Sequence, residues 1–90
     1  MSKKKIENAV KVLEEIKAEV NAGVIKDSKI SKLRNMETAR ETGLAVVLNL
    51  STKHDYPSTI IDKWRKRLDA EDYVISVIRK TLRITFNVMY

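Results

Sequence analysis

The chain has 90 residues, 43% of them hydrophobic and 33% charged, and its 18 Lys and Arg against 12 Asp and Glu give a formal net charge of +6. This length allows one domain, residues 1–90, with one hydrophobic core; it excludes a multidomain enzyme, and the apolar content is too high for a disordered tail. The chain has no cysteine, which excludes disulfide bonds and cysteine-based zinc sites.

The first part of the chain predicts a helix followed by a strand. Apolar residues recur every three to four positions from about Lys4 to Ala22, the spacing of an amphipathic helix, and Gly23 stands where a helix-ending glycine is favoured. Val24 to Leu33 is expected to be extended, and its imperfect alternation indicates a bulge or a weak edge strand. The polar segment Asn35 to Thr42 predicts a loop or an irregular hairpin end, which Gly43 closes.

The middle of the chain predicts a central strand and a second helix. Apolar residues alternate from Leu44 to Leu50, and the residues between them are only mildly polar. Ser51 to Pro57 is rich in turn-forming residues, and a helix is expected from about Ser58 to Leu68. Ser58 or Thr59 can cap this helix, with Asp62 three residues after Thr59 as in a capping box. The apolar face of this helix consists of Ile60, Ile61, Trp64 and Leu68.

The last eighteen residues, Tyr73 to Tyr90, contain no Gly or Pro, and from Leu82 onward apolar and polar residues alternate as in a strand with one buried face. A single strand of this length would extend about 60 Å, too long for so small a domain. Either the segment bends into two strands near Arg79 to Arg83, or part of it leaves the domain and pairs with another chain. Neither alternative has a turn signature, so both stay open.

The order of the elements is therefore α-β-β-α-β, with one more strand if the last segment divides. This order predicts an α+β domain, a two-layer sandwich with two helices on one face of an antiparallel sheet. No apolar stretch reaches the roughly 20 residues of a membrane helix. Charged residues follow the basic start Met1 to Lys5, where a signal peptide would be apolar. We therefore expect a soluble, cytoplasmic protein without a membrane partner.

The positive charge is concentrated in two strand segments. Residues 23–34 and residues 73–90 each contribute a net charge of +3, and the rest of the chain is neutral overall. Basic strands can contact nucleic-acid phosphates. Lysines on edge strands also prevent edge-to-edge aggregation, and charge alone does not decide between these roles. The candidate phosphate-binding residues are Lys26, Lys29, Lys32, Arg34, Arg79, Lys80 and Arg83.

Two further basic clusters have a structural interpretation. Acidic neighbours neutralise Lys63 to Arg67, which is expected to be a solvated helix face with Trp64 turned into the core; the alternative is a phosphate contact from the helix end. Lys3 to Lys5 is expected to be a solvated helix start, and its alternative is a flexible nucleic-acid-binding arm.

No catalytic or metal motif is present in the sequence. His54 is the only histidine, and its neighbours Ser51, Thr52 and Asp55 do not make a catalytic triad by adjacency alone. One histidine with scattered carboxylates is not a recognisable set of metal ligands, and the two glycines lie too far apart for a phosphate-binding loop. Because aromatic residues are few, recognition of the RNA backbone or shape fits better than base stacking. We expect a binding protein without enzyme activity, cofactor or small-molecule substrate.

Three stretches of the chain carry a family resemblance. Asn21 to Ile25 contains a Gly-x-Val step at a helix-to-strand junction, Gly43 to Leu50 is a glycine-led strand, and Leu68 to Arg79 leads from the second helix into a strand. These stretches resemble the small-subunit ribosomal protein six family, bacterial or mitochondrial. The resemblance implies a ferredoxin-like β-α-β-β-α-β domain that binds small-subunit ribosomal RNA beside small-subunit protein eighteen.

The chain also departs from this family in the order of its elements. The family begins with a strand, whereas this chain begins with a helix. The segment that is similar to the family's opening strand, Arg83 to Tyr90, stands at the end of this chain. This placement fits a circularly permuted arrangement or a strand given to a neighbouring chain. No Gly or Asn lies between Ile78 and Ile84 to form a tight hairpin, so both remain open.

Two functional hypotheses follow from these observations. The first is an RNA-binding, ribosomal-type protein, in the cytoplasm or in an organelle, whose basic strands neutralise ribosomal RNA phosphates and whose sheet edge docks a protein neighbour. The second is a protein–protein interaction module, either a homo-oligomer formed by strand exchange or an inhibitor of a larger partner. Its interface would be Phe86, Val88 and Tyr90 of the overlong final segment. An engineered fold without function is a third alternative.

Overall fold

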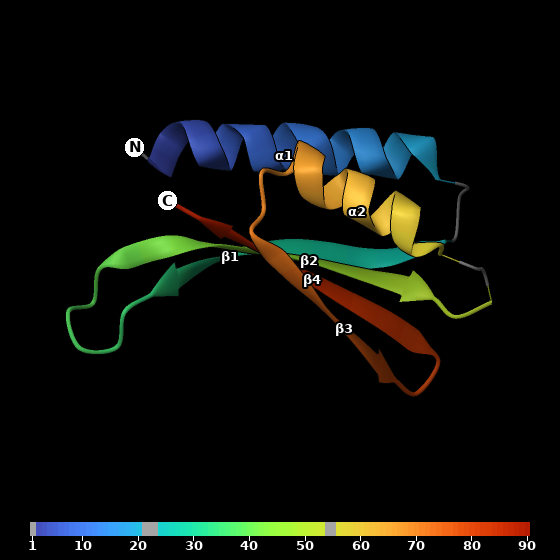
Figure 1. The fold of residues 1–90 in the computed structure, drawn as a ribbon. Helices are drawn as coiled ribbons and strands as arrows, with labels where there is room; N and C mark the ends of the chain where they lie inside the picture. Colours follow the sequence, from blue (N-terminus) through green and yellow to red (C-terminus); the bar gives the residue numbers. More distant parts are fainter. Residues whose placement is uncertain (1, 21–23, 54–55) are drawn as a thin grey trace.

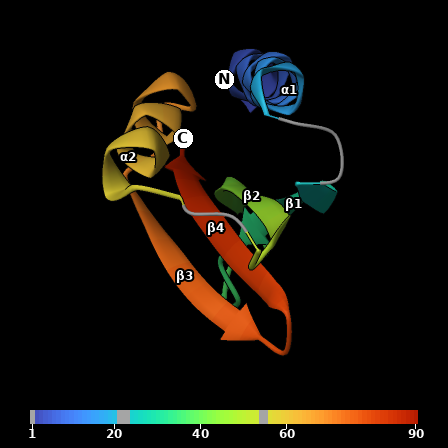
Figure 2. The ribbon, with the colours of Figure 1, turned by 90° about the vertical axis from the view of Figure 1, so that its right-hand side faces the viewer.

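The computed structural model describes residues 2–20, 24–53 and 56–90, and within them two helices and four strands form two layers. In chain order these are α1 (Ser2–Glu19), β1 (Ile25–Arg34), β2 (Glu41–Ser51), α2 (Ser58–Arg67), β3 (Asp72–Ile78) and β4 (Thr81–Met89). The strands form one open antiparallel sheet with the order β1-β2-β4-β3. Both helices cover the same face of this sheet (Figure 1, Figure 2). The expected α+β class, with two helices on one face of an antiparallel sheet, is confirmed.

The last segment of the chain divides into two strands. β3 and β4 form a hairpin whose turn consists of Arg79 and Lys80. Arg79 has a φ of 57°, so an arginine occupies a left-handed conformation that favours glycine or asparagine. The turn therefore had no recognisable signature in the sequence. The expected bend into two strands near Arg79 to Arg83 is confirmed, and the alternative that part of the segment leaves the domain is wrong.

The hydrophobic core lies between the helices and the two central strands, β2 and β4. Trp64 of α2 and Ile16 of α1 pack on this core, and both are buried. Alternate residues of the central strands point toward the helices, as the period of a strand requires. The core residues of these two strands are Leu44, Val46, Leu48, Leu50, Ile84, Phe86 and Val88, none more than 1% exposed.

Gly43 lies inside β2 and does not close the preceding loop, so that expectation is wrong. The strand already begins at Glu41, and Gly43 pairs with Met89 of β4. A Cβ atom at position 43 would lie 2.4 Å from the carbonyl oxygen of Val88. Glycine is needed here because the two central strands approach each other closely at this point, and not because the chain turns.

Both helices differ from the sequence expectation at their ends. α1 ends at Glu19 and not at Ala22, and Gly23 lies outside the described residues. Pro57 precedes α2 without any side-chain cap, so the predicted capping box is wrong; Asp62 instead contacts Arg65 and Lys66. Within the described residues, no helix is long and apolar enough to cross a membrane.

The two outer strands are β1 and β3. β1 pairs with β2 through a register that shifts between Ile25 and Asp27 and again between Leu33 and Arg34. This confirms the expected bulged edge strand. Figure 1 shows that the β3–β4 hairpin extends away from the helices at its turn, which leaves much of β3 uncovered on both faces.

Candidate nucleic-acid interface

The face of the sheet that the helices leave open carries a row of polar side chains across three strands. The strand register places Asp27, Asn49 and Arg83 next to one another on β1, β2 and β4. The side-chain amide of Asn49 donates a hydrogen bond to Asp27 Oδ1, and Asn49 Oδ1 accepts a hydrogen bond of 3.0 Å from Arg83 Nε. These bonds hold the guanidinium group of Arg83 over the open face, with its remaining donors available to a ligand.

Lys26 connects this row to the β3–β4 turn. Its Nζ donates hydrogen bonds of 3.1 Å to the carbonyl oxygen of Lys80 and to the hydroxyl oxygen of Thr81. The Thr52 hydroxyl lies 3.4 Å from the same carbonyl oxygen. The start of β1, the end of β2 and the turn therefore meet at one end of the sheet.

We call the cations gathered there the basic end, defined as Lys26, Lys29, Arg79, Lys80 and Arg83. All five are exposed, and none of them makes an ion pair with a residue that the structure describes. Two hollows in the open face adjoin these residues, one beside Lys29 and Arg83 and the other beside Lys26 and Arg79. Asp27 is the acidic residue that lines both hollows. The basic end thus has a surplus of positive charge facing solvent.

The other two candidate cations, Lys32 and Arg34, do not belong to this group. They lie toward the far end of β1, where Lys32 Nζ is 3.2 Å and an Arg34 guanidinium nitrogen is 3.9 Å from Glu41 Oε1. This one carboxylate partly offsets the charge of the two cations. The structure therefore divides the seven candidate residues into five that lie together and two that are paired elsewhere.

The candidate partner-interface residues are mostly buried. Phe86 and Val88 are fully buried in the core, so their side chains cannot contact a partner in this fold. Tyr90 is 42% exposed, and its backbone N–H donates to the carbonyl oxygen of Thr42. The final segment suggested a free strand because of its length, but it divides into β3 and β4, and the alternation of β4 places its apolar side chains under the helices.

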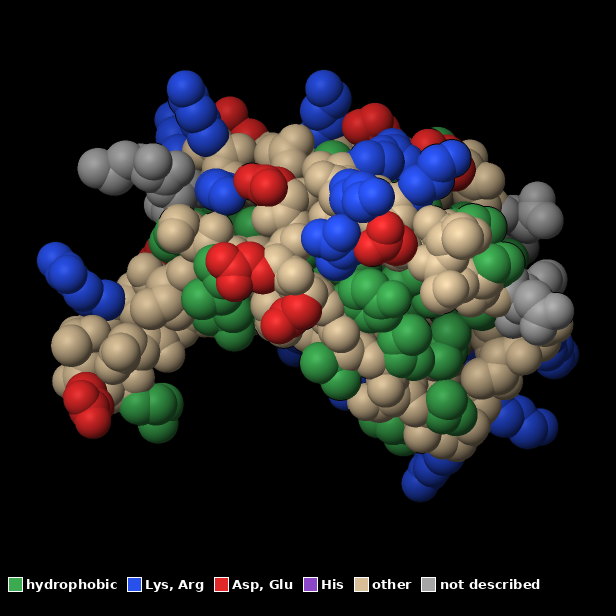
Figure 3. Space-filling view, in the orientation of Figure 1, with side chains coloured by type: hydrophobic (Ala, Val, Ile, Leu, Met, Phe, Trp, Pro, Cys, Tyr) green, Lys and Arg blue, Asp and Glu red, His purple; other side chains and the backbone are tan. Residues whose placement is uncertain are grey.

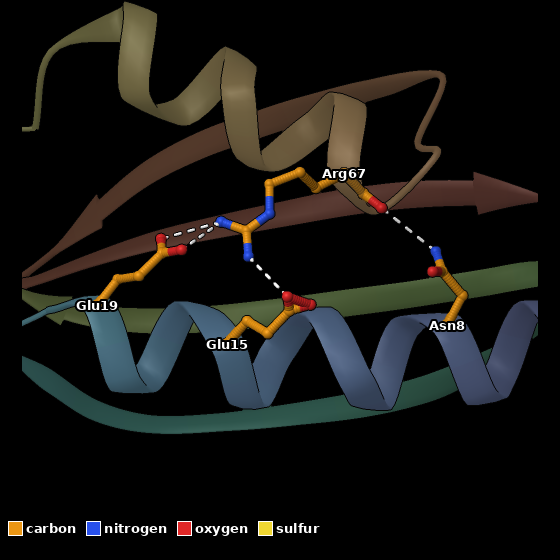
Figure 4. Close-up of polar contacts among 4 residues, drawn as sticks. All are labelled: Asn8, Glu15, Glu19 and Arg67. Atoms are coloured by element: carbon orange, nitrogen blue, oxygen red, sulfur yellow. Dashed lines mark hydrogen bonds and ion pairs between the residues drawn. The ribbon is translucent and has the colours of Figure 1, made fainter.

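The cationic cluster of α2 has a structural role. Arg67 reaches from α2 to α1, where its guanidinium group lies 2.8 Å from Glu19 Oε1 and 3.2 Å from Glu15 Oε2 (Figure 4). The Asn8 side chain donates to the carbonyl oxygen of Arg67. The hydrogen bond from Arg67 to Glu19 raises the pKa of its guanidinium group. Trp64 is buried, which confirms that it turns into the core.

Among the residues that the structure describes, Asp62 and Asp69 are the carboxyl groups with a shifted pKa. The hydrogen bond from Arg65 lowers the pKa of Asp62, and the hydrogen bond from Lys5 lowers the pKa of Asp69. The Asp69–Lys5 pair is exposed and joins α1 to the segment after α2, whereas the Asp62–Arg65 pair is partly buried and lies within α2. Their chemistry is that of stable ion pairs and does not resemble a catalytic acid and base.

His54 and Asp55, which the sequence singled out beside Ser51, lie outside the described residues. The described part of the chain contains no group of three or more His, Cys, Asp or Glu side chains that could hold a metal ion. Tyr56 donates a hydrogen bond of 2.7 Å to the carbonyl oxygen of Ser51, and burial raises the pKa of its hydroxyl. This contact joins Tyr56, two residues before α2, to the end of β2.

Sequence reasoning missed two features of this surface. Lys53 is exposed and directly follows Thr52, which contacts the β3–β4 turn. It was not counted among the candidate cations because its segment, residues 35–57, has a negative net charge. The exposed apolar residues of β3 were also missed, although the uncharged run from Tyr73 to Ile78 was a visible signal.

Comparisons with known proteins add no relative. No family model matches this chain, and neither a curated protein nor a solved structure matches it.

Proposed function

We propose that this chain is a ferredoxin-like domain in circularly permuted order. In that fold, two parallel strands joined through a helix are separated by a third strand, an arrangement called a split β-α-β unit. β2, α2 and β3 have this arrangement, with β4 between the two parallel strands. The start of α1 and the end of β4 lie on the same side of the molecule (Figure 1, Figure 2). Joining them would make β4, α1 and β1 a second such unit, divided by β2.

The function that the geometry supports best is binding of structured RNA through its phosphates. The observation that carries this proposal is the basic end, where five exposed cations gather without an ion pair to any described residue. These side chains would displace cations condensed on the RNA phosphates, and the release of those cations would drive binding. Arg83, oriented by Asn49, can donate two parallel hydrogen bonds to a phosphate.

The recognition would be of backbone and shape, without catalysis. Beside Arg83, the open face carries Val47 and Thr85, which offer no aromatic surface for stacking bases. The resemblance to the small-subunit ribosomal protein six family supports ribosomal RNA as the partner, and the permuted order explains why the strand similar to its first one stands last. According to this proposal, the protein is associated with the ribosome, in the cytoplasm or in an organelle.

Fluorescence anisotropy with a labelled structured RNA tests the proposal. The triple variant Lys26→Gln/Lys29→Gln/Arg83→Gln should bind roughly 10- to 100-fold more weakly at about 50 mM salt, and the slope of log K against log salt should fall by roughly 2 to 3. The matched control is Lys3→Gln/Lys4→Gln/Lys11→Gln on the outer surface of α1, which removes the same charge from exposed positions.

The control also separates specific contacts from general attraction. We expect it to change the affinity by less than about threefold. If the two triple variants lose the same affinity, net charge and not the basic end drives binding. If the unchanged protein does not bind at about 50 mM salt, the proposal is wrong.

A further inference from the structure

β3 is an edge strand without the usual protection of an edge. It pairs only with β4, and its register from Asp72 to Ile78 is continuous. From Tyr73 to Ile78 it has no charged residue, proline or glycine. Four of its large apolar side chains are 45% to 65% exposed, namely Val74, Ile75, Val77 and Ile78. Figure 3 shows hydrophobic side chains gathered below the charged surface of α2, where Figure 1 places β3.

The free side of β3 offers backbone hydrogen bonds as well as apolar surface. In an antiparallel pair, every second residue turns its N–H and C=O groups away from its partner. On an edge strand these groups are available to an added strand. The site therefore fits an extended segment of about six residues that is apolar in its middle.

The charges at the two ends of β3 indicate what that segment is. Glu71 and Asp72 stand at its start, and Arg79 and Lys80 follow its end. All four side chains are exposed. A second β3 in the antiparallel direction brings the acidic end of one strand to the basic end of the other, twice by symmetry. We propose that β3 pairs with β3 of a second copy of this chain and joins the two four-stranded sheets into one.

The side chains along the strand are self-complementary in this arrangement. With Ser76 opposite its own symmetry mate, Val74 faces Ile78, Ile75 faces Val77, and Asp72 faces Lys80. Cross-strand apolar and opposite-charge pairs each stabilise a sheet by roughly 0.2–1 kcal/mol. A parallel pairing would instead bring like charges together at both ends. Two-fold symmetric contacts of this kind are the commonest in homo-oligomers.

The interface is small, so the dimer should be weak and should depend on concentration. A single pair of strands buries less area than a standard interface, which places its dissociation constant in roughly the micromolar range. In the dimer, the second copy partly offsets the charge of Arg79 and Lys80. Lys26, Lys29 and Arg83 remain free of that contact, because they lie on β1 and β4.

Sedimentation equilibrium from about 1 to about 300 µM tests the pairing. We expect the mass to rise from 10.4 kDa toward twice that value with increasing concentration. Val77→Lys should raise the dimer dissociation constant at least tenfold, because it places two lysines in the apolar row. The matched control, Ser31→Lys, adds the same charge to the other edge and should leave the dimer unchanged. Circular dichroism confirms that both variants fold.

A charge exchange tests the direction of the strands independently of Val77. Glu71→Lys/Asp72→Lys and Arg79→Glu/Lys80→Glu should each be monomeric, whereas an equimolar mixture of the two should dimerise. A monomer at all concentrations, a dimer that survives Val77→Lys, or a mixture that stays monomeric would overturn the proposal.

Discussion

The two edges of the sheet are built in opposite ways. β1 carries four Lys or Arg and one Asp among its ten residues, and its register against β2 shifts twice. β3 has one charged residue, Asp72 at its start, and a continuous register against β4. Charged side chains and bulges prevent a further strand from adding to an edge. The chain therefore blocks pairing at β1 and leaves it open at β3.

This contrast also separates two roles for the cations of β1. Edge protection and phosphate binding were alternatives for the whole strand when only the charge was known. In the structure, Lys32 and Arg34 lie beside Glu41, whereas Lys26 and Lys29 lie at the basic end without an ion pair to a described residue. In one half of the strand the cations thus share an ion-pair partner that partly offsets their charge, whereas in the other half they have charge available to a ligand.

The largest effect is expected from replacing a core residue that packs against β3, the exposed edge strand. Phe86 of β4 is fully buried, and its ring centroid lies 5.9 Å from that of Tyr73 on β3. Phe86→Ala should lower the free energy of unfolding by about 3–5 kcal/mol, because it leaves a cavity between the sheet and the helices. Urea denaturation followed by circular dichroism measures this loss.

The matched control for Phe86 is its neighbour on the open face. Thr85→Ala should cost less than about 1 kcal/mol, because the removed atoms are partly exposed and leave no cavity. Equal losses from the two variants would contradict the placement of the core on the helix side of β4.

The next largest effect is expected when the lysines that protect the β1 edge are replaced by apolar residues. Lys29→Val/Lys32→Val should convert this edge into a second pairing site, so that copies add at both edges of the sheet. Dynamic light scattering should then detect assemblies larger than a dimer at concentrations where the unchanged chain forms none. The control is Lys63→Val/Lys66→Val on α2, which removes the same charge from exposed positions away from any edge. If both variants assemble alike, lost solubility and not strand pairing is the cause.

A smaller effect is expected from glycine substitutions in the two hairpin turns, one beside each edge strand. Arg79 in the β3–β4 turn has a φ of 57°, and Ala39 in the β1–β2 loop has a φ of 58°. Glycine relieves the strain of a left-handed residue, so Arg79→Gly and Ala39→Gly should each raise the melting temperature by about 2–4 °C, equivalent to about 0.5 kcal/mol. Only Arg79→Gly should also weaken RNA binding. Unequal gains in thermal stability would show that the two turns are not strained alike.

Much of the fold was predictable because its elements have clear periods. The apolar stripe of α1 and the alternation of β2 gave the class, the layers and the central position of Leu44 to Leu50. The β3–β4 turn was not predictable, because an arginine occupies a conformation whose usual residues are Gly and Asn. Gly43 was misplaced for a related reason, since a glycine where two paired strands approach closely looks in sequence like a glycine in a turn.

The candidate site was predictable only in part. Its charge was visible, but the sequence could not show that Glu41 lies beside Lys32 and Arg34, because that pairing depends on the strand register. Phe86 and Val88 were assigned to an interface because the final segment looked too long for a strand of this domain. The segment instead forms a hairpin, and both side chains lie in the core. The ion pairs of Glu41 and the burial of Phe86 and Val88 both depend on contacts between segments that are far apart in the sequence.

The smallest expected effect concerns the connection that leads into β3. Lys5 Nζ lies 2.8 Å from Asp69 Oδ2, which joins α1 to the short segment between α2 and β3. The hydrogen bond from Lys5 lowers the pKa of Asp69 below its ordinary value of 3.8. The unfolded chain therefore takes up the proton first as the pH falls. The pair stabilises the fold above about pH 4, and this contribution is lost as the pH falls through the folded-state pKa.

Asp69→Asn removes this titration without disturbing the backbone, because asparagine tolerates the φ of 57° at this position. The variant should lose less thermal stability between pH 7 and about pH 2.5 than the unchanged chain, and Lys5→Gln should reproduce the difference. Because both side chains are exposed, the difference should be smaller than the effects above and should shrink at high salt. An unchanged acid response in both variants would mean that this pair does not help to hold the segment that leads into β3, which is then held by its strand pairing with β4 and by the Tyr73–Phe86 contact.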